Sequence, residues 1–539
     1  MKKYLLIILI IIFAAVLRFY AVSDFPSGLN ADEAALGYNA YSLLNTGKDE
    51  DGHLLPVNLE SFGDYKPALY SYLLVPVVKF LGLNEFAVRL PSALFGVLSV
   101  FLIFVFVLLI TYNYKLSAVS SVLLAISPWH LHFSRGAWEV NVSTALILLG
   151  VIFFLKWRKT PTFINFTFFL LNLILSMYTY QSARVISPLL LFGLLIISYK
   201  YVFSHAKTCM AALPLMFLIS LPLLFSVFNK DTASRLSGVG LLADMGPLNL
   251  VNELRGQYHG PGAVLEKMLF NRPVFYTIQF IKNYLSHFDG NFLFIGGDAI
   301  QRNRVPETGL LYWTDFVFLL FGLFYLLKIK NSKLKIVWLW LLVAPVAAAM
   351  TFQVPHALRA QNMVIPLTII TAAGLSYFLG LFSDWKLSVI CILVLGIYTY
   401  QFTRYLHEYY VHYPQTYPSA WEYGFKEMVA YVARNQDRYH RILVTDKYDQ
   451  PYILFLFYLK YPPQKFQGHH ELTLRDRYNF STVKQFDKYR FTDTNWNLVR
   501  DIHGTLIVAA PEDIPSVGVN IVKTIYFPGG SPAFKIISN

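Results

Sequence analysis

Two adjacent carboxylates follow the first hydrophobic segment of the chain. The segment covers residues 4–22, and the doublet Asp32-Glu33 lies within the stretch 28–41. A segment of this length crosses a hydrocarbon core of about 30 Å, which takes roughly 20 apolar residues. Charge at a membrane boundary is costly unless water, a cation or a reaction uses it. The doublet is therefore either a catalytic group or the acidic first turn of a helix that Asn30 caps.

The composition indicates a membrane protein with many spans. The chain has 539 residues, of which 55% are hydrophobic and 14% are charged, unlike a soluble enzyme. The net charge is +13, but many cations lie in short loops between apolar runs, whereas nucleic-acid binding needs a basic face on a water-soluble domain. Cys209 and Cys391 lie in apolar stretches, which indicates neither a disulfide framework nor a metal cluster. We therefore expect the lipid bilayer as a partner and no nucleic acid.

Apolar runs recur along the chain and predict a polytopic α-helical protein with about eleven transmembrane helices. They lie near residues 4–22, 87–110, 116–132, 140–155, 162–180, 185–203, 208–228, 315–329, 335–352, 361–380 and 386–403. The third run is the weakest, because it carries several serines and Pro128. The first lacks a small-residue cleavage site and is expected to remain as an anchor. Lysines and arginines gather in alternate short loops, so the positive-inside rule predicts a cytoplasmic N-terminus and an extracytoplasmic tail on the plasma membrane.

The predicted domains are a transmembrane catalytic domain, 1–403, and an extracytoplasmic soluble α/β domain, 404–539. The first domain carries long outer loops at 23–86 and 229–314. The second of these loops is expected to act as a lid or an acceptor groove, because long loops without regular structure are usually functional or disordered. In the first, the tyrosine-rich segment 68–83 predicts an interfacial helix.

The tail shows the pattern of a mixed sheet with helices. Residues 441–446 and 505–510 predict buried strands, and residues 450–459 predict a helix between them. The tail has no phosphate-binding glycine loop, nucleophile elbow or metal-ligand spacing. We therefore expect it to support the catalytic domain or to recognise the acceptor.

Four outer turns combine a charged or imidazole side chain with a proline or aromatic residue at a membrane boundary. The residues of interest in these turns are Asp64, Tyr65 and Lys66; Arg135 and Glu139; Tyr180 and Arg184; and His356 and Arg359. A lone arginine at a helix end usually snorkels to lipid headgroups. Because the outer side does not require cations for topology, their recurrence indicates either anionic headgroups or a bound phosphate substrate.

Sugar transfer from a lipid-linked phosphate suits one carboxylate beside several cations. Glycosidases need two carboxylates, because one of them must protonate a poor leaving group. A phosphate leaves readily, so one carboxylate base and cations that receive the departing charge suffice. A cation about 4 Å from a phosphate oxygen contributes roughly 4 kcal/mol at an effective dielectric constant near 20.

These motifs, in this order, resemble the membrane-embedded GT-C glycosyltransferases. The similarity is greatest to bacterial relatives of the protein O-mannosyltransferases and of the aminoarabinose lipid A transferase. It rests on Leu29-Asn30-Ala31-Asp32-Glu33-Ala34, Lys66-Pro67, Arg89-Leu90-Pro91-Ser92-Ala93-Leu94, Ser127-Pro128-Trp129-His130, Ser134-Arg135 and Pro355-His356-Ala357-Leu358-Arg359. The similarity spans roughly the first 400 residues.

The resemblance implies a GT-C fold, a polyprenyl-phosphate sugar donor and inversion at the anomeric carbon. It makes Asp32 the base that takes the proton of a hydroxyl-bearing acceptor, with Glu33 as a helper or a structural neighbour. Lys66 and the cations of the other outer turns would hold the donor phosphate: Arg135, Arg184, His356 and Arg359. Further site candidates are Asp64, Tyr65, Glu139 and Tyr180. Relatives often carry a second proline where this chain has Ala68, which affects the geometry of the turn and not the lysine.

No cofactor is expected. Some GT-C enzymes use a divalent metal, but the sequence shows no dedicated ligand cluster for one. The acceptor is open between a protein, a lipid and a cell-envelope glycan.

The main alternative function is a transporter or flippase of a lipid-linked sugar. Such a protein would more often place its charges near the bilayer midplane, whereas here they gather at one face. An oligosaccharyltransferase would normally carry a longer outer domain with its own peptide-recognition motif, and the tail shows none.

Overall fold

The computed structural model describes residues 2–228, 240–257, 267–329, 331–475, 481–515 and 517–539. The described chain divides into two compact units. The helical unit comprises Met1–Ala14, Val97–Leu131 and Ser143–Phe402, and the mixed unit comprises Ala15–Gly96, His132–Val142 and Thr403–Asn539. The first outer loop and the tail therefore belong to the same unit. The predicted division into domains 1–403 and 404–539 stays a prediction.

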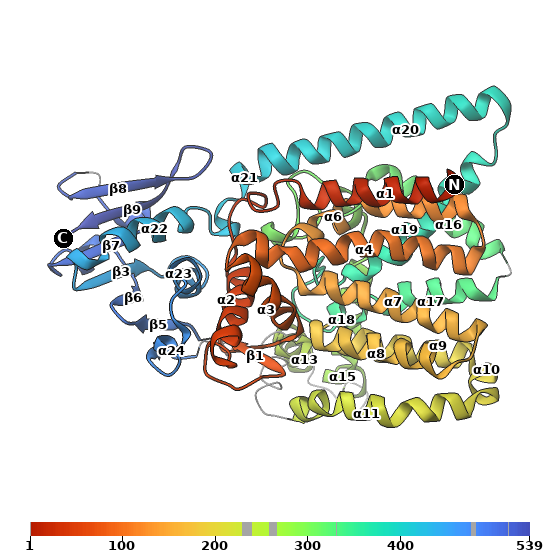
Figure 1. The fold of residues 1–539 in the computed structure, drawn as a ribbon, viewed down its shortest axis with the longest axis horizontal. Coiled ribbons are helices and arrows are strands. Elements are labelled where there is room, and N and C mark those ends of the chain that lie inside the picture. Colours follow the sequence, from red (N-terminus) through yellow and green to blue (C-terminus); the bar gives the residue numbers. More distant parts are fainter. Residues whose placement is uncertain (1, 229–239, 258–266, 330, 476–480, 516) are drawn as a thin grey trace. The chain divides into compact units, whose positions relative to one another are not determined.

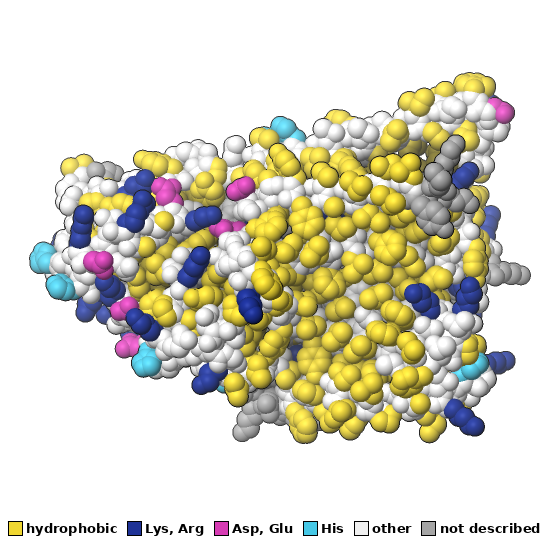
Figure 2. Space-filling model, in the orientation of Figure 1, with side chains coloured by type: hydrophobic (Ala, Val, Ile, Leu, Met, Phe, Trp, Pro, Cys, Tyr) yellow, Lys and Arg dark blue, Asp and Glu magenta, His cyan; other side chains and the backbone are white. Residues whose placement is uncertain are grey.

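The helical unit is built from long apolar helices (Figure 1). Helices that lie in it wholly or in part are α1 (Lys2–Phe19), α4 (Glu85–Thr111), α5 (Tyr114–Ile126), α6 (Pro128–Arg135), α7 (Glu139–Lys159), α8 (Phe163–Thr179), α9 (Ala183–Ile197), α10 (Tyr199–Ser204), α11 (Ala206–Phe228), α13 (Gly246–Gly256), α15 (Arg272–Ser286), α16 (Trp313–Lys328), α17 (Lys335–Val343), α18 (Val346–Ala349), α19 (Val364–Leu379) and α20 (Asp384–His407). Figure 2 shows hydrophobic side chains covering most of this unit's visible face. Large apolar side chains such as Phe217, Phe225, Leu327 and Ile392 are exposed, as a lipid-facing surface requires.

Each of the eleven predicted apolar runs lies on helical structure, but the predicted number of spans is not confirmed. Among the described residues, six helices are long and apolar enough to cross a membrane, or seven if a bent pair forms one span. The bent pair is α5 and α6, which meet at an angle of 56°. The break falls directly before Pro128 in the run predicted to be the weakest, because proline cannot donate the backbone hydrogen bond that would continue α5.

Close packing of α16 on α19 depends on two glycines. A Cβ atom on Gly374 would lie 1.8 Å from the carbonyl oxygen of Phe318, and one on Gly322 would lie 2.0 Å from that of Ile370. Small residues at such positions let two helix backbones approach closely in a membrane protein. This pair forms part of the core of the helical unit.

In the mixed unit, the first outer loop is folded around a short helix and a hairpin. Its elements are α2 (Ala31–Thr46), β1 (Asn58–Ser61), β2 (Asp64–Pro67) and α3 (Leu69–Leu81). The strands β1 and β2 pair antiparallel, with Leu59 opposite Lys66. The helix predicted over 68–83 is therefore present as α3, and its position in the interface stays a prediction.

The tail forms a seven-stranded mixed sheet in the order β4-β5-β6-β3-β7-β9-β8. Its strands are β3 (Arg441–Thr445), β4 (His470–Leu472), β5 (Val483–Phe486), β6 (Tyr489–Thr492), β7 (Thr505–Ala509), β8 (Ile521–Tyr526) and β9 (Pro532–Ser538). Short helices accompany them: α21 (Tyr413–Thr416), α22 (Phe425–Asn435), α23 (Pro451–Leu459), α24 (Pro463–Phe466) and α25 (Trp496–Val499).

The two strands predicted in the tail are confirmed as β3 and β7, which pair parallel at the centre of this sheet. The helix predicted between them is α23, which begins at Pro451. Parallel strands are buried on both faces and read as continuous apolar runs, which is why these elements could be located from the sequence.

The predicted outer loop 229–314 contains regular structure, including α13 and α15. Residues 229–239 and 258–266 of this loop lie outside the described residues. Its role as a lid or an acceptor groove stays a prediction.

Candidate active site

The acidic doublet lies in the first turn of α2, where the two carboxylates face different surroundings. The side chain of Asn30 accepts a hydrogen bond from the Glu33 N–H at 3.0 Å, and the Glu33 carboxylate accepts one from the Asn30 N–H at 3.4 Å. This reciprocal capping satisfies two donors at the helix start. The Asp32 side chain is 30% exposed and the Glu33 side chain only 1%. The capping alternative is thus confirmed for Glu33, while Asp32 remains accessible for chemistry.

Glu33 forms a buried ion pair with Arg89 of α4. Its carboxylate accepts hydrogen bonds from Arg89 Nη2 at 2.9 Å and Nε at 3.0 Å, and from the Ala137 N–H at 2.7 Å. Arg89 also donates to the carbonyl oxygens of Val22 and Pro26, at 2.9 and 3.0 Å. Through these bonds, the ion pair holds together three parts of the mixed unit: the segment after α1, the start of α2 and the start of α4. Of the two predicted roles, the geometry favours Glu33 as a structural neighbour of Asp32.

Lys66 donates a hydrogen bond to the carboxylate of Asp32. It lies on β2, and its side chain is 13% exposed, with its ammonium 4.5 Å from the ring centre of Phe62. Burial alone would lower the pKa of Lys66, but the negative charge of Asp32 and the hydrogen bond to it, with Glu139, raise this pKa above its usual value. Lys66 is therefore a cation at neutral pH, held directly beside the predicted base.

Of the other predicted candidates of this unit, Asp64 and Tyr65 lie on β2 and Glu139 lies at the start of α7. The Asp64 carboxylate accepts a hydrogen bond from the Tyr65 N–H at 2.8 Å, and the Tyr65 hydroxyl donates to Glu60 at 2.9 Å. Glu139 begins α7 and is 7% exposed. Together with Asp32, the negative charges of Glu139 and Asp64 raise the pKa of Lys66. Asp32, Asp64, Glu139 and Lys66 thus form one charged group.

Arg135 is 1% exposed and uses most of its donors within the protein. It donates to the carbonyl oxygens of Leu17 at 2.6 Å, Tyr20 at 2.8 Å and Phe25 at 3.2 Å, and to the hydroxyl of Tyr409 at 3.2 Å. These bonds occupy four of the five N–H groups of a guanidinium. Arg135 therefore holds the segment after α1, and its contact with the donor phosphate stays a prediction.

A second acidic group in the first outer loop was not predicted from the sequence. Glu50 is buried and accepts hydrogen bonds from the hydroxyls of Tyr452 and Ser61, each at 3.0 Å. Burial raises the pKa of Glu50 well above its usual value. Asp51 lies 3.5 Å from Nε2 of His470, and burial together with neighbouring acids raises the pKa of Asp51 to about 7. These contacts join the loop to the sheet of the same unit.

The remaining predicted residues belong to the helical unit: Tyr180, Arg184, His356 and Arg359. Tyr180 is 9% exposed and follows α8. Arg184 donates to the carbonyl oxygen of Met177 at 3.3 Å, and Arg359 donates to the hydroxyl of Thr351 at 2.8 Å. The structure therefore places the predicted site residues in two sets, one in each unit.

His356 lies between two partners that the sequence analysis missed. Its backbone N–H donates to Nε2 of His287 at 3.3 Å, and its ring Nδ1 is 3.7 Å from the carboxylate of Asp298. That carboxylate also accepts a hydrogen bond from the Ala357 N–H at 2.7 Å. Burial, and then the positive charge of Arg359, lower the pKa of His356 well below its usual value. The imidazole is therefore neutral near pH 7.

His287 is fixed in one tautomer by its own helix. Its Nδ1 lies 2.8 Å from the carbonyl oxygen of Asn283, which can only accept, so Nδ1 carries the proton. Nε2 is then free to accept from the His356 backbone. Burial lowers the pKa of His287 to about 4. The turn that carries His356 and Arg359 is thus held by residues from the outer loop 229–314.

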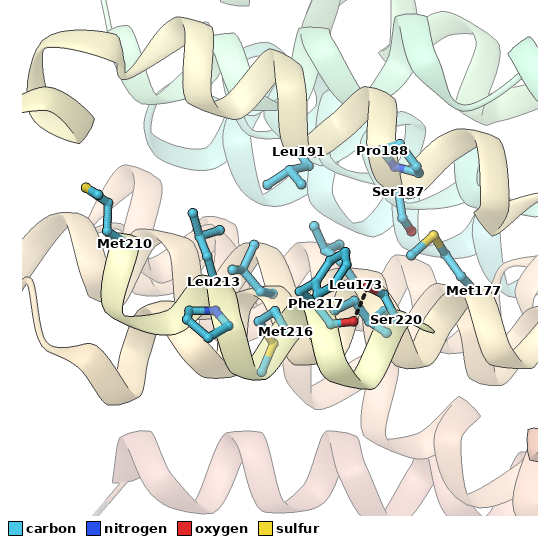
Figure 3. Close-up of a pocket in the computed structure, with 13 residues that line it drawn as sticks. Leu173, Met177, Ser187, Pro188, Leu191, Met210, Leu213, Met216, Phe217 and Ser220 are labelled. Atoms are coloured by element: carbon cyan, nitrogen blue, oxygen red, sulfur yellow. Dashed lines mark hydrogen bonds between the residues drawn. The ribbon is translucent and has the colours of Figure 1, made fainter. Parts of the chain in front are cut away.

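An apolar pocket lies between three helices of the helical unit (Figure 3). Its volume is about 670 Å³, and α8, α9 and α11 contribute its walls. Leu173 and Met177 come from α8, Pro188 and Leu191 from α9, and Phe217 from α11. Such a lining is suited to hydrocarbon, because it offers almost no polar partner.

Comparisons with known proteins identify this architecture. Residues 8–179 match the dolichyl-phosphate-mannose-protein mannosyltransferase family. ArnT from Cupriavidus metallidurans bound to undecaprenyl phosphate is similar over 98% of this chain and 97% of its own, with 10% identity and a TM-score of 0.56. The fold is that of a GT-C membrane glycosyltransferase. The predicted GT-C resemblance is confirmed, and the chain is a multi-pass membrane protein.

Two further structures share the GT-C fold. ArnT in the apo state is similar over 98% of this chain and 97% of its own, with 11% identity and a TM-score of 0.52. The archaeal oligosaccharyltransferase AglB from Archaeoglobus fulgidus was solved with an inhibitory peptide and a dolichol-phosphate. It is similar over 85% of this chain, which spans 63% of the AglB chain, with 11% identity and a TM-score of 0.53. No curated protein sequence matches the chain.

Proposed function

We propose that this protein is an inverting glycosyltransferase that moves a hexosyl or pentosyl group from a polyprenyl-phosphate donor to a hydroxyl-bearing acceptor. The observation that carries the proposal is the partly exposed Asp32, held at the start of α2 by a buried capping box and paired with Lys66. The GT-C fold and the similarity to ArnT bound to undecaprenyl phosphate support this class of donor. The acceptor is a protein, a lipid or a cell-envelope glycan.

In this proposal, Asp32 is the general base. It takes the proton of the acceptor hydroxyl while the acceptor oxygen attacks the anomeric carbon from the face opposite the phosphate. The bond between the anomeric carbon and the phosphate oxygen breaks, and the polyprenyl phosphate leaves with the electron pair. A positioned base of this kind contributes about 10²–10⁴-fold to the rate.

Lys66 takes part both in the proton transfer to Asp32 and in the departure of the phosphate. Its ammonium pairs with Asp32 and would turn toward the donor phosphate when this binds. The same movement would free Asp32 to accept a proton. A cation that receives the departing charge acts as an electrostatic stabiliser of the transition state, worth about 2.7–4 kcal/mol where comparable contacts have been removed.

We assign Glu33 to positioning, because its carboxylate is bound by Arg89 and by backbone N–H groups. Arg184, His356 and Arg359 are proposed as further phosphate contacts from the helical unit, with His356 acting as a neutral donor. Arg135 would contribute mainly its charge, because its guanidinium is bonded within the mixed unit.

The reaction would take place on the extracytoplasmic face of the plasma membrane, with the N-terminus in the cytoplasm and the tail outside. The donor's polyprenyl chain would lie in the hydrocarbon core, for which the apolar pocket between α8, α9 and α11 is suited. The expectation from the sequence that the charged turns gather at the outer face favours this orientation over a midplane site.

The test supplies a polyprenyl-phosphate sugar, labelled in both the sugar and the lipid, to the purified protein in vesicles with envelope extract as the acceptor. The transferase releases polyprenyl phosphate and moves the sugar label into the acceptor fraction, and Asp32→Asn lowers both rates by about 10²–10⁴-fold. Glu427→Gln, at an exposed carboxylate paired with Lys523, is the matched control. A transporter would move the lipid across the bilayer without cleaving it, and that result would replace the proposal with the flippase alternative.

A further inference from the structure

Three metal-ligating side chains meet where the last long helix ends. After α20, the chain forms one π turn, Glu408–His412, before α21. Side-chain ligand atoms of His407, Glu408 and His412 all lie within 4.8 Å of one another. The two imidazole rings are 4.9 Å apart between centroids. Both histidines are exposed and Glu408 is half-buried, so an ion could reach all three from solvent.

The π turn is what brings the two histidines together. They are five residues apart, and at 3.6 residues per turn an α-helix would place them about 140° apart around the axis. Here the Tyr413 N–H donates to the carbonyl oxygen of Glu408, five residues earlier. This extra residue in the turn moves His412 onto the face of His407. Single π turns of this kind often occur at functional sites.

The opposite face of the turn is anchored in the protein. Tyr409 and Tyr413 are 1% and 2% exposed, and their ring centroids are 5.9 Å apart. The Tyr409 hydroxyl accepts a hydrogen bond from Arg135. Burial of these two tyrosines fixes the rotation of the turn, so the three ligating side chains remain on the outward face.

The order of the residues explains the geometry. His407-Glu408-Tyr409-Tyr410-Val411-His412 is a histidine pair with one more residue between its members than the i, i+4 pair that binds zinc from one helix face. The π turn absorbs this residue. A sequence search for the shorter spacing therefore passes over the segment.

We propose that His407, Glu408 and His412 form a binding site for a divalent transition-metal ion of the zinc class. Two imidazole nitrogens and one carboxylate oxygen are ligands that zinc accepts, and water would take a fourth position. Imidazole favours zinc, copper and nickel over magnesium and calcium, which prefer oxygen ligands. Neighbouring ligand atoms in a tetrahedral zinc site are about 3.3 Å apart, from metal–ligand distances of about 2.0–2.1 Å. Exposed side chains can close from 4.8 Å to that separation by small rotations.

The bound ion would join α20 to the turn that precedes α21. Because the ion binds the folded turn and not the unfolded chain, it should raise the thermal stability of the protein in a concentration-dependent way. The three ligands lie far from the proposed base Asp32 in sequence and include no residue of the proposed transferase site. The role proposed for the ion is therefore structural, and the test of zinc binding does not depend on sugar transfer.

The experiment measures zinc binding to the full-length protein in detergent, purified without a polyhistidine tag and freed of metal with a chelator. Equilibrium dialysis against Zn²⁺ should give about one tightly bound ion per chain. His407→Ala/His412→Ala should weaken this binding by more than the roughly 10–100-fold that loss of a mere outer-shell partner costs, and Glu408→Gln should weaken it less. His440→Ala/His503→Ala removes the same number of exposed imidazoles from the mixed unit and should bind as the parent does.

A second measurement, the melting temperature against Zn²⁺ concentration, should rise for the parent and the control and stay flat for His407→Ala/His412→Ala. Mg²⁺ in large excess should displace no zinc. The proposal is overturned by an absence of tight zinc in the parent, by equal zinc in the His407→Ala/His412→Ala protein, by loss of zinc in the control, or by ready displacement by Mg²⁺.

Discussion

The buried ion pair between Glu33 and Arg89 gives a stability prediction that the contacts make quantitative. Both side chains are almost fully excluded from water, at 1% and 0% exposure. Arg89→Met removes two charge-assisted hydrogen bonds to the carboxylate and leaves the carbonyl oxygens of Val22 and Pro26 without this donor. Loss of one partner of such a pair costs about 3–5 kcal/mol, because the other charge stays buried.

The double variant separates the charge effect from the packing effect. In Glu33→Gln/Arg89→Met no charge is left buried, and we expect it to be more stable than Arg89→Met alone, with a coupling free energy of about 2 kcal/mol or more. The assay is denaturant unfolding in a mild detergent, followed by tryptophan fluorescence for the parent, both single variants and the double variant.

A surface pair of the same unit provides the control. Lys523 and Glu427 are 40% and 55% exposed and lie 3.0 Å apart, and Lys523→Met should cost less than about 1 kcal/mol. If Arg89→Met is no more destabilising than Lys523→Met, or if the double variant is as unstable as the sum of the single ones, the reasoning about the buried pair is wrong.

Three further outcomes follow from the structure. Gly374→Ala places a Cβ atom against a backbone carbonyl and should cost about 1–3 kcal/mol or more, whereas Gly396→Ala, whose added atom meets nothing within 4 Å, should be neutral or stabilising by up to about 1 kcal/mol in thermal unfolding. Because the folded-state pKa of Asp51 is raised to about 7, its stabilising contribution is present below about pH 4 and is lost as the pH rises through 7. The unfolding free energy of Asp51→Asn should therefore rise relative to that of the parent as the pH increases from 5 to 8. A constant difference between the two proteins over this range would contradict the raised pKa of Asp51. Lys66→Ala should lower kcat for sugar transfer by about 10²–10³-fold with Lys66→Arg partly active, and parent-like turnover in Lys66→Ala would remove the lysine from the mechanism.

Much of this fold could be predicted because apolar runs and strand patterns are local signals. The long apolar helices, α3, α23, the central strands β3 and β7, and the capped start of α2 were predicted at the positions where they occur. The number of spans was harder to predict. Length and composition define a span, and α8 and α9 are too short to pass that criterion on their own. The bend before Pro128 also divides the predicted apolar run 116–132 into two helices, α5 and α6.

The site was predictable only in part, because its contacts join residues far apart in the chain. Asp32 and Lys66 are 34 residues apart and form a hydrogen bond, which the order of the motifs suggested through the family resemblance. Arg89 was part of a recognised motif, but its partner 56 residues away could not be assigned from a single sequence. His287 and Asp298 come from a long loop in which no element was predicted, and nothing local pointed to their contact with the turn of His356.

The candidate metal site shows a different limit. No ligand cluster was recognised in the sequence. The two histidines have a spacing that an ordinary helix does not bring together. Only the π turn of Glu408–His412 makes them neighbours. A search for ligand pairs based on 3.6-residue periodicity does not detect a pair whose spacing differs from it by one residue.

The release of polyprenyl phosphate by Asp32→Asn tests the central claim most directly. The variant keeps the shape of the side chain and the start of α2 but removes the base. We expect single-turnover release from a labelled polyprenyl-phosphate sugar to fall by about 10²–10⁴-fold, while donor binding and the unfolding free energy stay close to those of the parent. Release within about tenfold of the parent, a change of less than about 1.4 kcal/mol in the barrier, would contradict the assignment of Asp32 as the base.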